Sequence, residues 1–450
     1  MDPWREIALA EERGPVLYDV DVAVCGGGPA GVAAAVVCAR QGLKTLLIEK
    51  NGFCGGAAVA GLSGTICGLY QAQDEIEKRE ARQIVFGFAG EFKDRLEAKE
   101  GLTPPQIYGN THVNTFEPFV WREVADDLLE EAGVICLYHT LVTAVSKDEE
   151  AFSSLFIESS AGRAQVKAKR FIDCTGDAAL IAKAGLPYTY GDKGAIQNPT
   201  MMFRLGRVVE EDYYAYFGHD TICPSDLTDK LTEAFESGTY DTPRNRIWVF
   251  PTPQEGVFLM NCTQLAGQQG EMLNVIDPAQ RTHAEISGRR AAREYMRFFK
   301  ENVTGFESAQ LVDMAPEVGV RQTRTIVGEK TLTNAHVSGC TKARDGIARS
   351  SWPIELHAGE VSKLLWLIDD YYEVPYGTLV PRHLKNVIVA GRCLSAEHEA
   401  LASSRVTAQC FEYGHAAAVA TALSLDAGCD YRDVDTDALR RRMTENGSAL

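Results

Sequence analysis

The stretch from Val20 to Glu49 constrains the fold of this chain more than any other part of its sequence. Residues 20–24 form an apolar, β-branched run of the length of one buried strand. Small residues from Pro29 to Arg40 predict a helix, and Thr45–Ile48 predicts a second short strand. A strand, a helix and a strand in this order are typical of a nucleotide-binding α/β unit.

Three glycines between the first strand and the helix have the G-x-G-x-x-G spacing of a dinucleotide-binding turn. Gly26 permits a tight turn, Gly28 lets a pyrophosphate approach the backbone, and Gly31 lets the helix pack against the strand. The phosphates would lie on the free N–H groups at the helix start. Glu49 lies 18 residues after Gly31, where its carboxylate can accept both ribose hydroxyls. The alternative is a glycine-rich turn in an unrelated α/β protein.

Length and composition limit the classes of protein that fit. At 450 residues the chain exceeds a typical single domain, which predicts two interleaved domains. The formal net charge of −17 argues against a nucleic-acid or anionic-membrane partner, because phosphates would repel such a surface. The net charge does not exclude an anionic substrate, because arginines can make one cleft locally positive.

Signals for targeting and for metals are missing from the sequence. Residues 1–14 are charged throughout, so we expect no signal peptide, and no apolar run is long enough to predict a membrane span. The 12 cysteines are scattered without a C-x-x-C pair, which argues against iron–sulfur and structural zinc sites. We therefore expect reduced thiols, no metal and a cytoplasmic protein.

Small residues continue after the second strand. Residues 51–68 are dominated by glycine and alanine, which permits close approach of a bulky flat ligand. Gly55 and Gly56 would place backbone N–H groups beside its phosphates or ribityl chain. The alternative is a flexible loop. Pro118–Ala132 then predicts a helix with proline in its first turn.

A strand meander follows this helix. Its four strands are expected at residues 134–137, 141–145, 154–159 and 164–168. The segment from Arg170 to Asp173 then leads into a turn that contains Thr175 and Gly176. This order predicts a three-layer flavoprotein domain rather than a plain nicotinamide domain. The chain has no second G-x-G-x-x-G, which argues against a two-nucleotide architecture.

The middle of the chain, residues 201–372, has a different sequence pattern, with aromatic-rich and strand-like segments around one long predicted helix. That helix is predicted over Pro278–Lys300, with Asp277 as its N-cap and with Ile286 and Phe299 facing inward. We interpret this region as an inserted α+β substrate-binding domain.

The last part of the chain is predicted to return to the first domain. Residues 386–390 predict a buried strand, Gly391 and Arg392 follow it, and Ser404–Leu423 predicts one alanine-rich helix. The positive helix N-terminus would stabilise negative charge on a reduced flavin. The predicted fold is therefore α/β, with a Rossmann-like three-layer FAD-binding domain and an inserted α+β domain. Its boundaries are 15–200 and 373–428 for the FAD-binding domain, 201–372 for the insertion, and 429–450 for a polar tail.

Taken together, the motifs resemble a known family. They are VCGGGPAGVAAA, IEKNGFCGGAA, FIDCTGD, VGVRQTRTIVGEKTLT, IARSSWPIELH and LKNVIVAGRCLSAEHEALASSRVTAQCFEYGHAAAVA, which span residues 18 to 425 or so. In this order they resemble the FAD-dependent oxidoreductase family of the glutathione-reductase-type superfamily and, more distantly, the fumarate reductase and L-aspartate oxidase flavoproteins. The resemblance implies non-covalent FAD and catalysis at the interface between the cofactor domain and its insertion.

The resemblance also suggests particular residues. In the fumarate reductase-like relatives a histidine after the late turn faces substrate and the next helix caps the flavin, which corresponds here to His398 and to the helix start at Ser404. This chain has Arg392 where those relatives have an acid, and His415 where its own family usually has glutamine. These departures put any transfer of substrate in doubt. The candidates for contact with FAD are Gly26, Gly28, Pro29, Ala30, Gly31, Glu49, Lys50, Gly55, Gly56, Val142, Thr175, Gly176, Gly391, Arg392, Ser404 and Val406.

Two histidines are candidates for a proton relay, because the ordinary pKa of histidine, about 6.5, lies near working pH. His398 is the first, and His357, at the end of the SSWPIELH segment, is the second. The alternative for each is a structural or exposed histidine.

Two arginines could orient a carboxylate or stabilise an oxyanion through their rigid fork. Arg405 lies in the turn that opens the predicted late helix, although it could simply contact FAD. Arg321 belongs to the RQTR segment, where a strand would point it away from Arg324. The alternative for this segment is a pair of ion-paired arginines near Glu329.

The function that the sequence predicts is hydride transfer between a CH–OH, CH–NH or CH–CH unit of a small polar substrate and flavin N5. One alternative is a flavin monooxygenase, and another is an FAD-binding subunit that passes electrons or binds tRNA. The expected partners are the substrate and an electron acceptor or donor, without nucleic acid or membrane. A homo-oligomer stays open, as do the substrate identity and the direction of the reaction.

Overall fold

A seven-stranded sheet organises the larger part of the protein, whose computed structural model describes residues 14–356 and 363–450. The strand order is β6-β2-β1-β9-β8-β7, and β20 pairs with β9 beyond the end of β8. The strands β6, β2, β1, β9 and β20 are parallel, whereas β7 and β8 form an antiparallel meander with β9. The bounds are β1 Val16–Cys25, β2 Thr45–Ile48, β6 Ile135–Leu137, β7 Leu141–Asp148, β8 Ala151–Ser159, β9 Gly162–Asp173 and β20 Val387–Val389.

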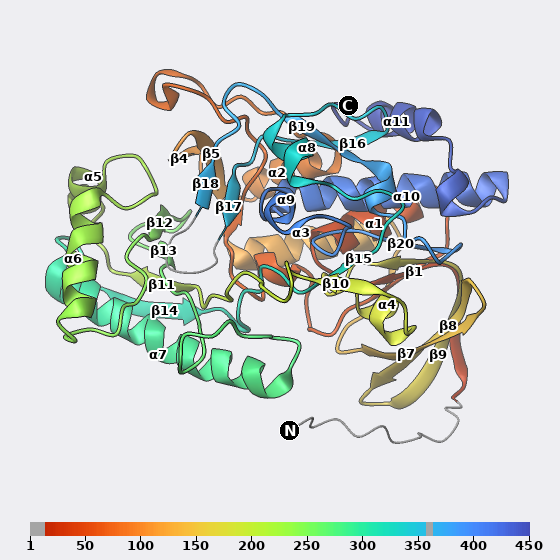
Figure 1. Ribbon diagram of the computed structural model, residues 1–450, viewed down its shortest axis with the longest axis horizontal. Coiled ribbons are helices and arrows are strands. Elements are labelled where there is room, and N and C mark those ends of the chain that lie inside the picture. The colour runs from red at the N-terminus through yellow and green to blue at the C-terminus, as the bar shows by residue number, and fades with distance from the viewer. Residues whose placement is uncertain (1–13, 357–362) are drawn as a thin grey trace.

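Helices cover one face of the parallel strands of this sheet, and the meander that β7 and β8 form with β9 lies under the opposite face of these strands, as Figure 1 shows. Along β1, Val22 and Val24 pack with the helices, while Ala23 and Cys25 belong to the cluster on the opposite face. This alternation is the period of two that a strand buried on both faces requires. The predicted α/β class with three layers is confirmed. The covering helices are α1 Pro29–Arg40, α2 Gly87–Ala98, α3 Pro118–Glu131 and α10 Thr407–Ala427.

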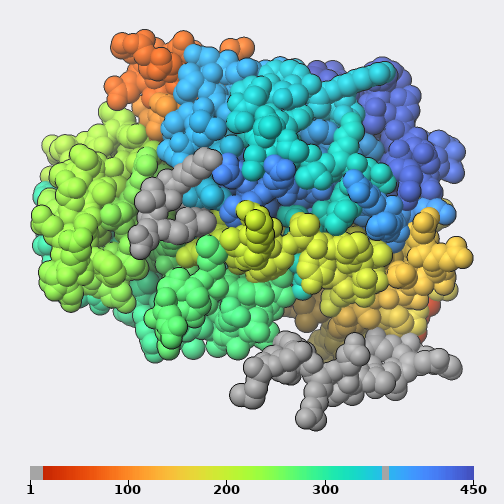
Figure 2. Space-filling view, in the orientation of Figure 1, coloured from red at the N-terminus to blue at the C-terminus, as the bar shows by residue number. Residues whose placement is uncertain are grey.

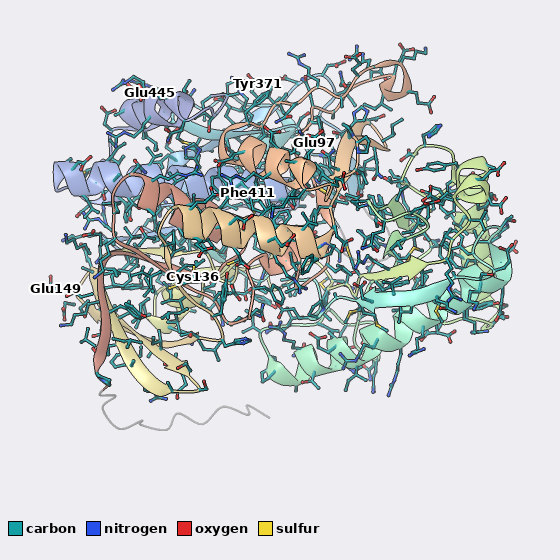
Figure 3. The ribbon with its side chains drawn as sticks, turned by 180° about the vertical axis from the view of Figure 1, so that it is seen from behind. Glu97, Cys136, Glu149, Tyr371, Phe411 and Glu445 are labelled. Carbon is teal, nitrogen blue, oxygen red and sulfur yellow. The ribbon has the colours of Figure 1, made fainter. Side chains whose placement is uncertain are left out.

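Aromatic side chains join the covering helices to one another. Phe411 of α10, labelled in Figure 3, contacts Phe92 of α2 and Trp121 of α3, with ring centroids 4.8 and 5.6 Å apart. Phe92 and Trp121 also meet directly, at 4.5 Å between centroids. Helix α10, near the end of the chain, is therefore held in place by residues from the first third of the chain.

A second sheet forms the other side of the molecule, where the green part of the chain gathers in Figure 2. Its order is β12-β13-β11-β14, all antiparallel, and it has a core of its own. The bounds are β11 Phe203–Gly206, β12 Trp248–Pro251, β13 Phe258–Asn261, β14 Gln310–Met314, α5 Glu210–Phe217, α6 Ser225–Glu236 and α7 Pro278–Asn302.

The long helix α7 matches its prediction except for one inward residue. The Asp277 side chain accepts hydrogen bonds from the N–H groups of Ala279 and Gln280, at 2.8 and 2.9 Å, and so caps the helix. Phe299 is fully buried, as expected. The prediction for Ile286 is wrong, because this side chain is 41% exposed. Small residues such as Gly288, two positions after Ile286 and so on the other side of the helix, form the buried face instead.

The helix predicted over Ser404–Leu423 corresponds to α10, which begins at Thr407, and a short helix that was not predicted, α9 His398–Ser404, comes before it. The first of the two helices ends at Ser404, and Val406, in an extended conformation, is the N-cap of α10. The hydroxyl of Tyr413 donates to the Ser404 carbonyl oxygen at 2.8 Å and satisfies the end of the first helix. Nothing in the local composition marks this break, because the residue that compensates for it lies on α10.

Short elements connect these layers. Before α2, residues 71–86 form turns, irregular segments and the short 3₁₀ helix Ile76–Lys78. Segments from Leu332 to Val374 pack in the same core as the covering helices. The remaining elements are β3 Thr65–Ile66, β4 Gln106–Tyr108, β5 Thr111–Thr115, β10 Tyr188–Tyr190, β15 Arg324–Ile326, β16 Gly346–Ser350, β17 Ile354–Leu356, β18 Lys363–Leu365, β19 Tyr372–Pro375, α4 Ala179–Lys183, α8 Asn334–Ser338, α9 His398–Ser404 and α11 Thr436–Glu445.

In the part of the chain that the structure describes, no helix combines the length and the apolar character that crossing a bilayer requires. Within the same residues, no group of histidine, cysteine and acidic side chains could hold a metal ion.

The C-terminal segment is fixed to α10 by buried polar side chains. Ser448 donates to Glu412 at 2.6 Å and contacts the Nδ1 atom of His415 at 3.1 Å, and all three side chains are buried. Helix α11 adds the buried Leu439 and Met443. The segment is therefore packed against the covering helices although its composition is polar.

Replacing Ser448 by alanine should lower the free energy of unfolding by about 1–3 kcal/mol, because a buried carboxyl group loses its hydrogen-bond donor. Urea unfolding measures this change, and Ser160→Ala, at an exposed position, is the matched control. Equal stabilities for the two variants would show that the Ser448 contact does not hold the segment.

Candidate active site

The turn between β1 and α1 is shaped by two glycines that tolerate no side chain. Gly26 has φ +98°, and a Cβ atom there would lie 2.5 Å from the carbonyl oxygen of Cys174. A Cβ atom on Gly31 would lie 1.8 Å from the carbonyl oxygen of Gly26. The helix start, the turn and the end of β9 therefore meet through backbone atoms alone.

The next glycine of the motif faces open space instead. A Cβ atom on Gly28 would have the Cα atom of Gly56, 3.8 Å away, as its nearest neighbour. No side chain caps α1, which begins with Pro29 and has Ala30 as its first N–H donor. Gly55 donates to the carbonyl oxygen of Gly27 at 2.7 Å and so fixes the second loop beside the helix start. This open backbone fits the approach of a pyrophosphate.

Glu49 lies at the end of β2 beside the same turn. Its carboxylate accepts from the N–H groups of Gly27 and Asn51, at 2.6 and 2.8 Å. Burial raises the pKa of Glu49, while these two backbone donors oppose the shift. The neighbouring Lys50 pairs with Glu317 at 2.7 Å.

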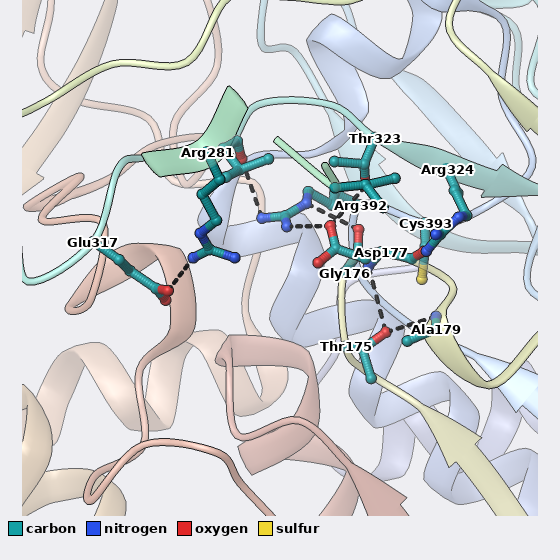
Figure 4. Close-up of polar contacts among 12 residues, drawn as sticks. Thr175, Gly176, Asp177, Ala179, Arg281, Glu317, Thr323, Arg324, Arg392 and Cys393 are labelled. Carbon is teal, nitrogen blue, oxygen red and sulfur yellow. Dashed lines mark hydrogen bonds and ion pairs between the residues drawn. The ribbon is translucent and has the colours of Figure 1, made fainter. Parts of the chain in front are cut away.

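The turn after β9 lies beside the turn after β20. The side chain of Arg392 donates to the Gly176 carbonyl oxygen at 2.9 Å and to the Asp177 carboxylate at 2.8 Å, as Figure 4 shows. It also reaches the carbonyl oxygen of Val320 at 3.1 Å. Arg392 is thus committed to protein contacts, so its backbone rather than its guanidinium is available to a ligand.

Electrostatics fix this pair. Burial acts to raise the pKa of Asp177, but Arg392 and the hydroxyl of Thr323 hold the pKa of that carboxyl below its usual value. Burial likewise opposes the charge of Arg392, and Asp177 raises the pKa of its guanidinium. Asp177 therefore has a structural role.

The other cofactor candidates surround the same turns. Thr175 donates to Asp173 at 2.6 Å, and a Cβ atom on Gly391 would lie 3.6 Å from the Cβ atom of Ala30. Val142 lies on β7. Thr140, the residue just before this strand, donates its N–H group to the Glu49 carbonyl oxygen at 3.0 Å. The turns that carry Ala30, Thr175, Gly176, Gly391 and Arg392 thus meet, and Lys50 lies close enough to lower the pKa of Asp177 by its charge.

The junction of α9 and α10 faces the site with unsatisfied polar groups. The hydroxyl of Ser404 is buried and has no partner among the described residues, and the same holds for the Nε atom of Arg405. The other end of that guanidinium donates to the Gln197 side chain at 3.0 Å. Val406, also buried, is the N-cap of α10.

His398 is the first residue of α9. Its Nδ1 atom is buried without a partner in the described part of the chain. Burial lowers the pKa of His398 below its usual 6.5; Asp192 and Glu399 oppose this shift, and Arg405 adds to it. The imidazole is therefore held neutral near physiological pH. His357, the second histidine candidate, lies outside the described residues.

Arg321 does not lie on a strand, contrary to the prediction, because β15 begins at Arg324. It is 7% exposed and donates to the Asn198 carbonyl oxygen at 2.8 Å. Arg324 donates to the Asp177 carbonyl oxygen at 3.3 Å, so it belongs to a different network. The alternative of ion pairs with Glu329 is wrong for both arginines, since the described partner of that acid is Arg432.

Sequence reasoning missed several residues that contact or lie near Arg321 or Arg405. They are Gln197, Asn198, Arg244, Asn261 and Glu355. Glu355 lies inside the IARSSWPIELH motif, which could have singled it out. The others lie in no motif, and only the tertiary structure brings them together.

The family of this chain can now be stated. The profile of the FAD dependent oxidoreductase family matches residues 21–443, and the chain belongs to this family. The resemblance found in the sequence is confirmed, and the protein is an FAD-dependent oxidoreductase. The cradle described above fits FAD, because it offers an uncapped helix start, an open glycine and a buried carboxylate.

Individual relatives match over short segments. Dihydrolipoyl dehydrogenase of Trypanosoma brucei brucei is 47% identical over 45 residues, which are 10% of this chain and 9% of that protein. Thiamine thiazole synthase of Methanococcoides burtonii is 47% identical over 57 residues, 12% of this chain and 22% of that protein. The chain thus spans less than a quarter of the curated relatives it matches.

One solved structure is similar over nearly the whole chain. A geranylgeranyl bacteriochlorophyll reductase-like protein from Thermoplasma acidophilum has a TM-score of 0.50 and 16% identity, and the match covers 95% of this chain and 84% of that one. This likeness shows that the two proteins share the fold.

The variant Gly28→Ala tests the candidate phosphate cradle. Gly28 has φ −70°, which alanine adopts freely, so the thermal midpoint of the apoprotein should not change. The affinity for FAD should fall roughly tenfold or more, because a methyl group would stand where the pyrophosphate approaches. Calorimetric titration of the apoprotein with FAD measures this.

The matched variant Gly31→Ala should destabilise the apoprotein itself, since its Cβ atom has no room. An unchanged FAD affinity in Gly28→Ala would contradict the assignment of this cradle.

Proposed function

We propose that the protein transfers a hydride between a small polar substrate and FAD, with His398 as proton relay and with Arg405 and Arg321 as substrate-binding groups. FAD, when bound, accepts or donates the hydride at N5 of its flavin ring. The observation that carries this proposal is the placement, at the two ends of α9, of a histidine with a lowered pKa and an Nδ1 atom without a partner among the described residues, and of an arginine whose Nε atom likewise has none there.

The chain's own residues supply orientation and proton transfer in this proposal. A guanidinium fork can hold a carboxylate or a developing oxyanion through two parallel hydrogen bonds. The neutral Nδ1 or Nε2 atom of His398 can take the proton that leaves a CH–OH or CH–NH unit, or return it in the reverse reaction. The positive N-terminus of α10 favours negative charge beside it.

The proposal extends to the organisation of the chain. We assign cofactor binding to residues 15–200 and 373–428, and substrate binding to side chains from residues 201–372. The buried guanidinium of Arg321 and the second sheet support this division. The described cysteines are all free thiols, which supports a cytoplasmic location.

Replacing His398 by glutamine should leave FAD bound but slow substrate-dependent bleaching of the flavin by about 10²–10⁴-fold. Anaerobic stopped-flow absorbance with a panel of small hydroxy acids, amines and saturated acids measures this rate. His219→Gln, at an exposed histidine, is the control. A flavin that NAD(P)H bleaches and that oxygen reoxidises with formation of a hydroxylated product would contradict the proposal and favour a monooxygenase.

The pH dependence gives a second readout of the same residue. Because burial lowers the pKa of His398, its neutral form persists below pH 6.5, and the acidic limb of the bleaching rate should lie below that value. In His398→Gln this limb should vanish. A limb that stays in place in the variant would remove His398 from the relay.

A further inference from the structure

We propose that Gln197 is a substrate-binding residue, and that its side-chain N–H group and the Nε–H group of Arg405 together hold a carbonyl group of the substrate. This inference rests on the proposed function of the same site and adds to it one residue and one feature of the substrate. It follows from how the Gln197 amide is bonded at one end and left without an acceptor at the other.

The orientation of the Gln197 amide is determined by its contact with Arg405. The Oε1 atom of Gln197 accepts a hydrogen bond from the Nη2 atom of Arg405 at 3.0 Å. Because a guanidinium group only donates hydrogen bonds, the amide oxygen must face it and the amide nitrogen must point elsewhere. The oxygen end of the amide is therefore used by the protein, and the donor end, Nε2, is left for another partner.

Two neighbouring donors lack acceptors at this contact. Gln197 is 1% exposed, and its Nε2 atom is buried without a partner among the described residues, as is the Nε atom of Arg405. Each of these atoms belongs to the same planar group as one end of the 3.0 Å contact, so the two donors lie close together. Buried donors without acceptors cost free energy, and a ligand that supplies an acceptor removes this cost. A carbonyl oxygen has two lone pairs and can accept from both donors.

The backbone that follows Gln197 is fixed to the second half of the chain. The Asn198 carbonyl oxygen accepts a hydrogen bond from the Arg321 side chain at 2.8 Å. The Pro199 carbonyl oxygen accepts from the N–H group of Leu265 at 2.9 Å, and residues 196–200 are all buried. The Gln197 side chain is thus held in place before a ligand arrives, which lowers the cost of binding one.

The same segment brings together the residues that the proposed function uses. It lies between β10 and β11, and it contacts Arg405 through Gln197 and Arg321 through the next carbonyl oxygen. Burial lowers the pKa of His398 and the charge of Asp192 opposes this shift, so Asp192 lies near that imidazole. A substrate that reaches both His398 and Arg405 therefore also meets Gln197.

Binding of hydroxy amides to the oxidised, FAD-loaded protein tests the proposal. Hydroxy amides of three to six carbons are compared with alcohols of the same shape, in which a methyl group replaces the oxygen and the nitrogen of the amide. The matching hydroxy acids form a third series. The flavin absorbance spectrum and the thermal midpoint report binding, and neither requires turnover. At least one hydroxy amide or hydroxy acid should bind about tenfold or more tightly than its matching alcohol, because the alcohol leaves the buried donors unpaired.

Two variants assign this preference to Gln197. Gln197→Glu keeps an acceptor for Arg405 but has no N–H donor, and Gln197→Met removes the donor without adding a charge. In both, the preference for the hydroxy amide over its alcohol should fall about fivefold or more, which corresponds to the loss of one hydrogen bond, while the affinity for FAD stays unchanged. Gln268→Glu, at an exposed position, adds the same charge as the first variant and should keep the preference.

Gln197→Glu alone decides the test if Gln197→Met does not fold, because it preserves the contact with Arg405. The absence of any preference for carbonyl-bearing ligands in the unchanged protein, or its persistence in either folded variant, would overturn the proposal.

Failure of this inference is distinguishable from failure of the proposed function. Anaerobic bleaching of the flavin at the same rate in the unchanged protein and in Gln197→Glu, without a preference for carbonyl-bearing ligands, would retain hydride transfer and exclude the role of Gln197. A preference that depends on Gln197, without any anaerobic bleaching, would retain the carbonyl site and exclude the hydride transfer.

Discussion

The backbone contact between α1 and the turn before it is the constraint on which the rest of the structure depends. No Cβ atom fits at Gly31, because the start of α1 lies directly against the backbone of the turn. The turn itself lies against the backbone at the end of β9. Helix α10 approaches just as closely, since a Cβ atom on Gly414 would lie 2.0 Å from the carbonyl oxygen of Ala30. Three distant segments of the chain thereby form one open backbone surface, which suits a cofactor with a pyrophosphate.

A partly buried ion pair then connects this surface to the region that carries the proposed substrate groups; the side chain of Arg392 is 16% exposed and that of Asp177 is 35% exposed. Arg392 and Asp177 belong to the turns after β20 and β9, and both reach across, Arg392 to Val320 and Asp177 to Thr323. The position of Arg321, one residue after Val320, is therefore coupled to the cofactor turns.

The sequence predicted correctly those elements that are determined by residues close to one another in the chain. The helix over Pro29–Arg40 and the cap at Asp277 were found because proline, aspartate and small residues determine them within a few positions. Helix α9 was missed because the Tyr413 hydroxyl, nine residues further along the chain, satisfies its last carbonyl group. The network around Arg321 was found only in part, since Arg244 and Gln197 have no spacing or motif that relates them in sequence. Side chains that meet only through tertiary packing leave no periodic signal.

The central claim is that the two ends of α9 present a neutral histidine and an arginine to the bound flavin. A crystal structure of the FAD-loaded protein tests this most directly. The account predicts that the flavin ring lies at the N-terminus of α10, with the His398 imidazole and the Arg405 guanidinium on one side of it. A ring bound elsewhere, or one whose face is covered by side chains other than these two, would contradict it.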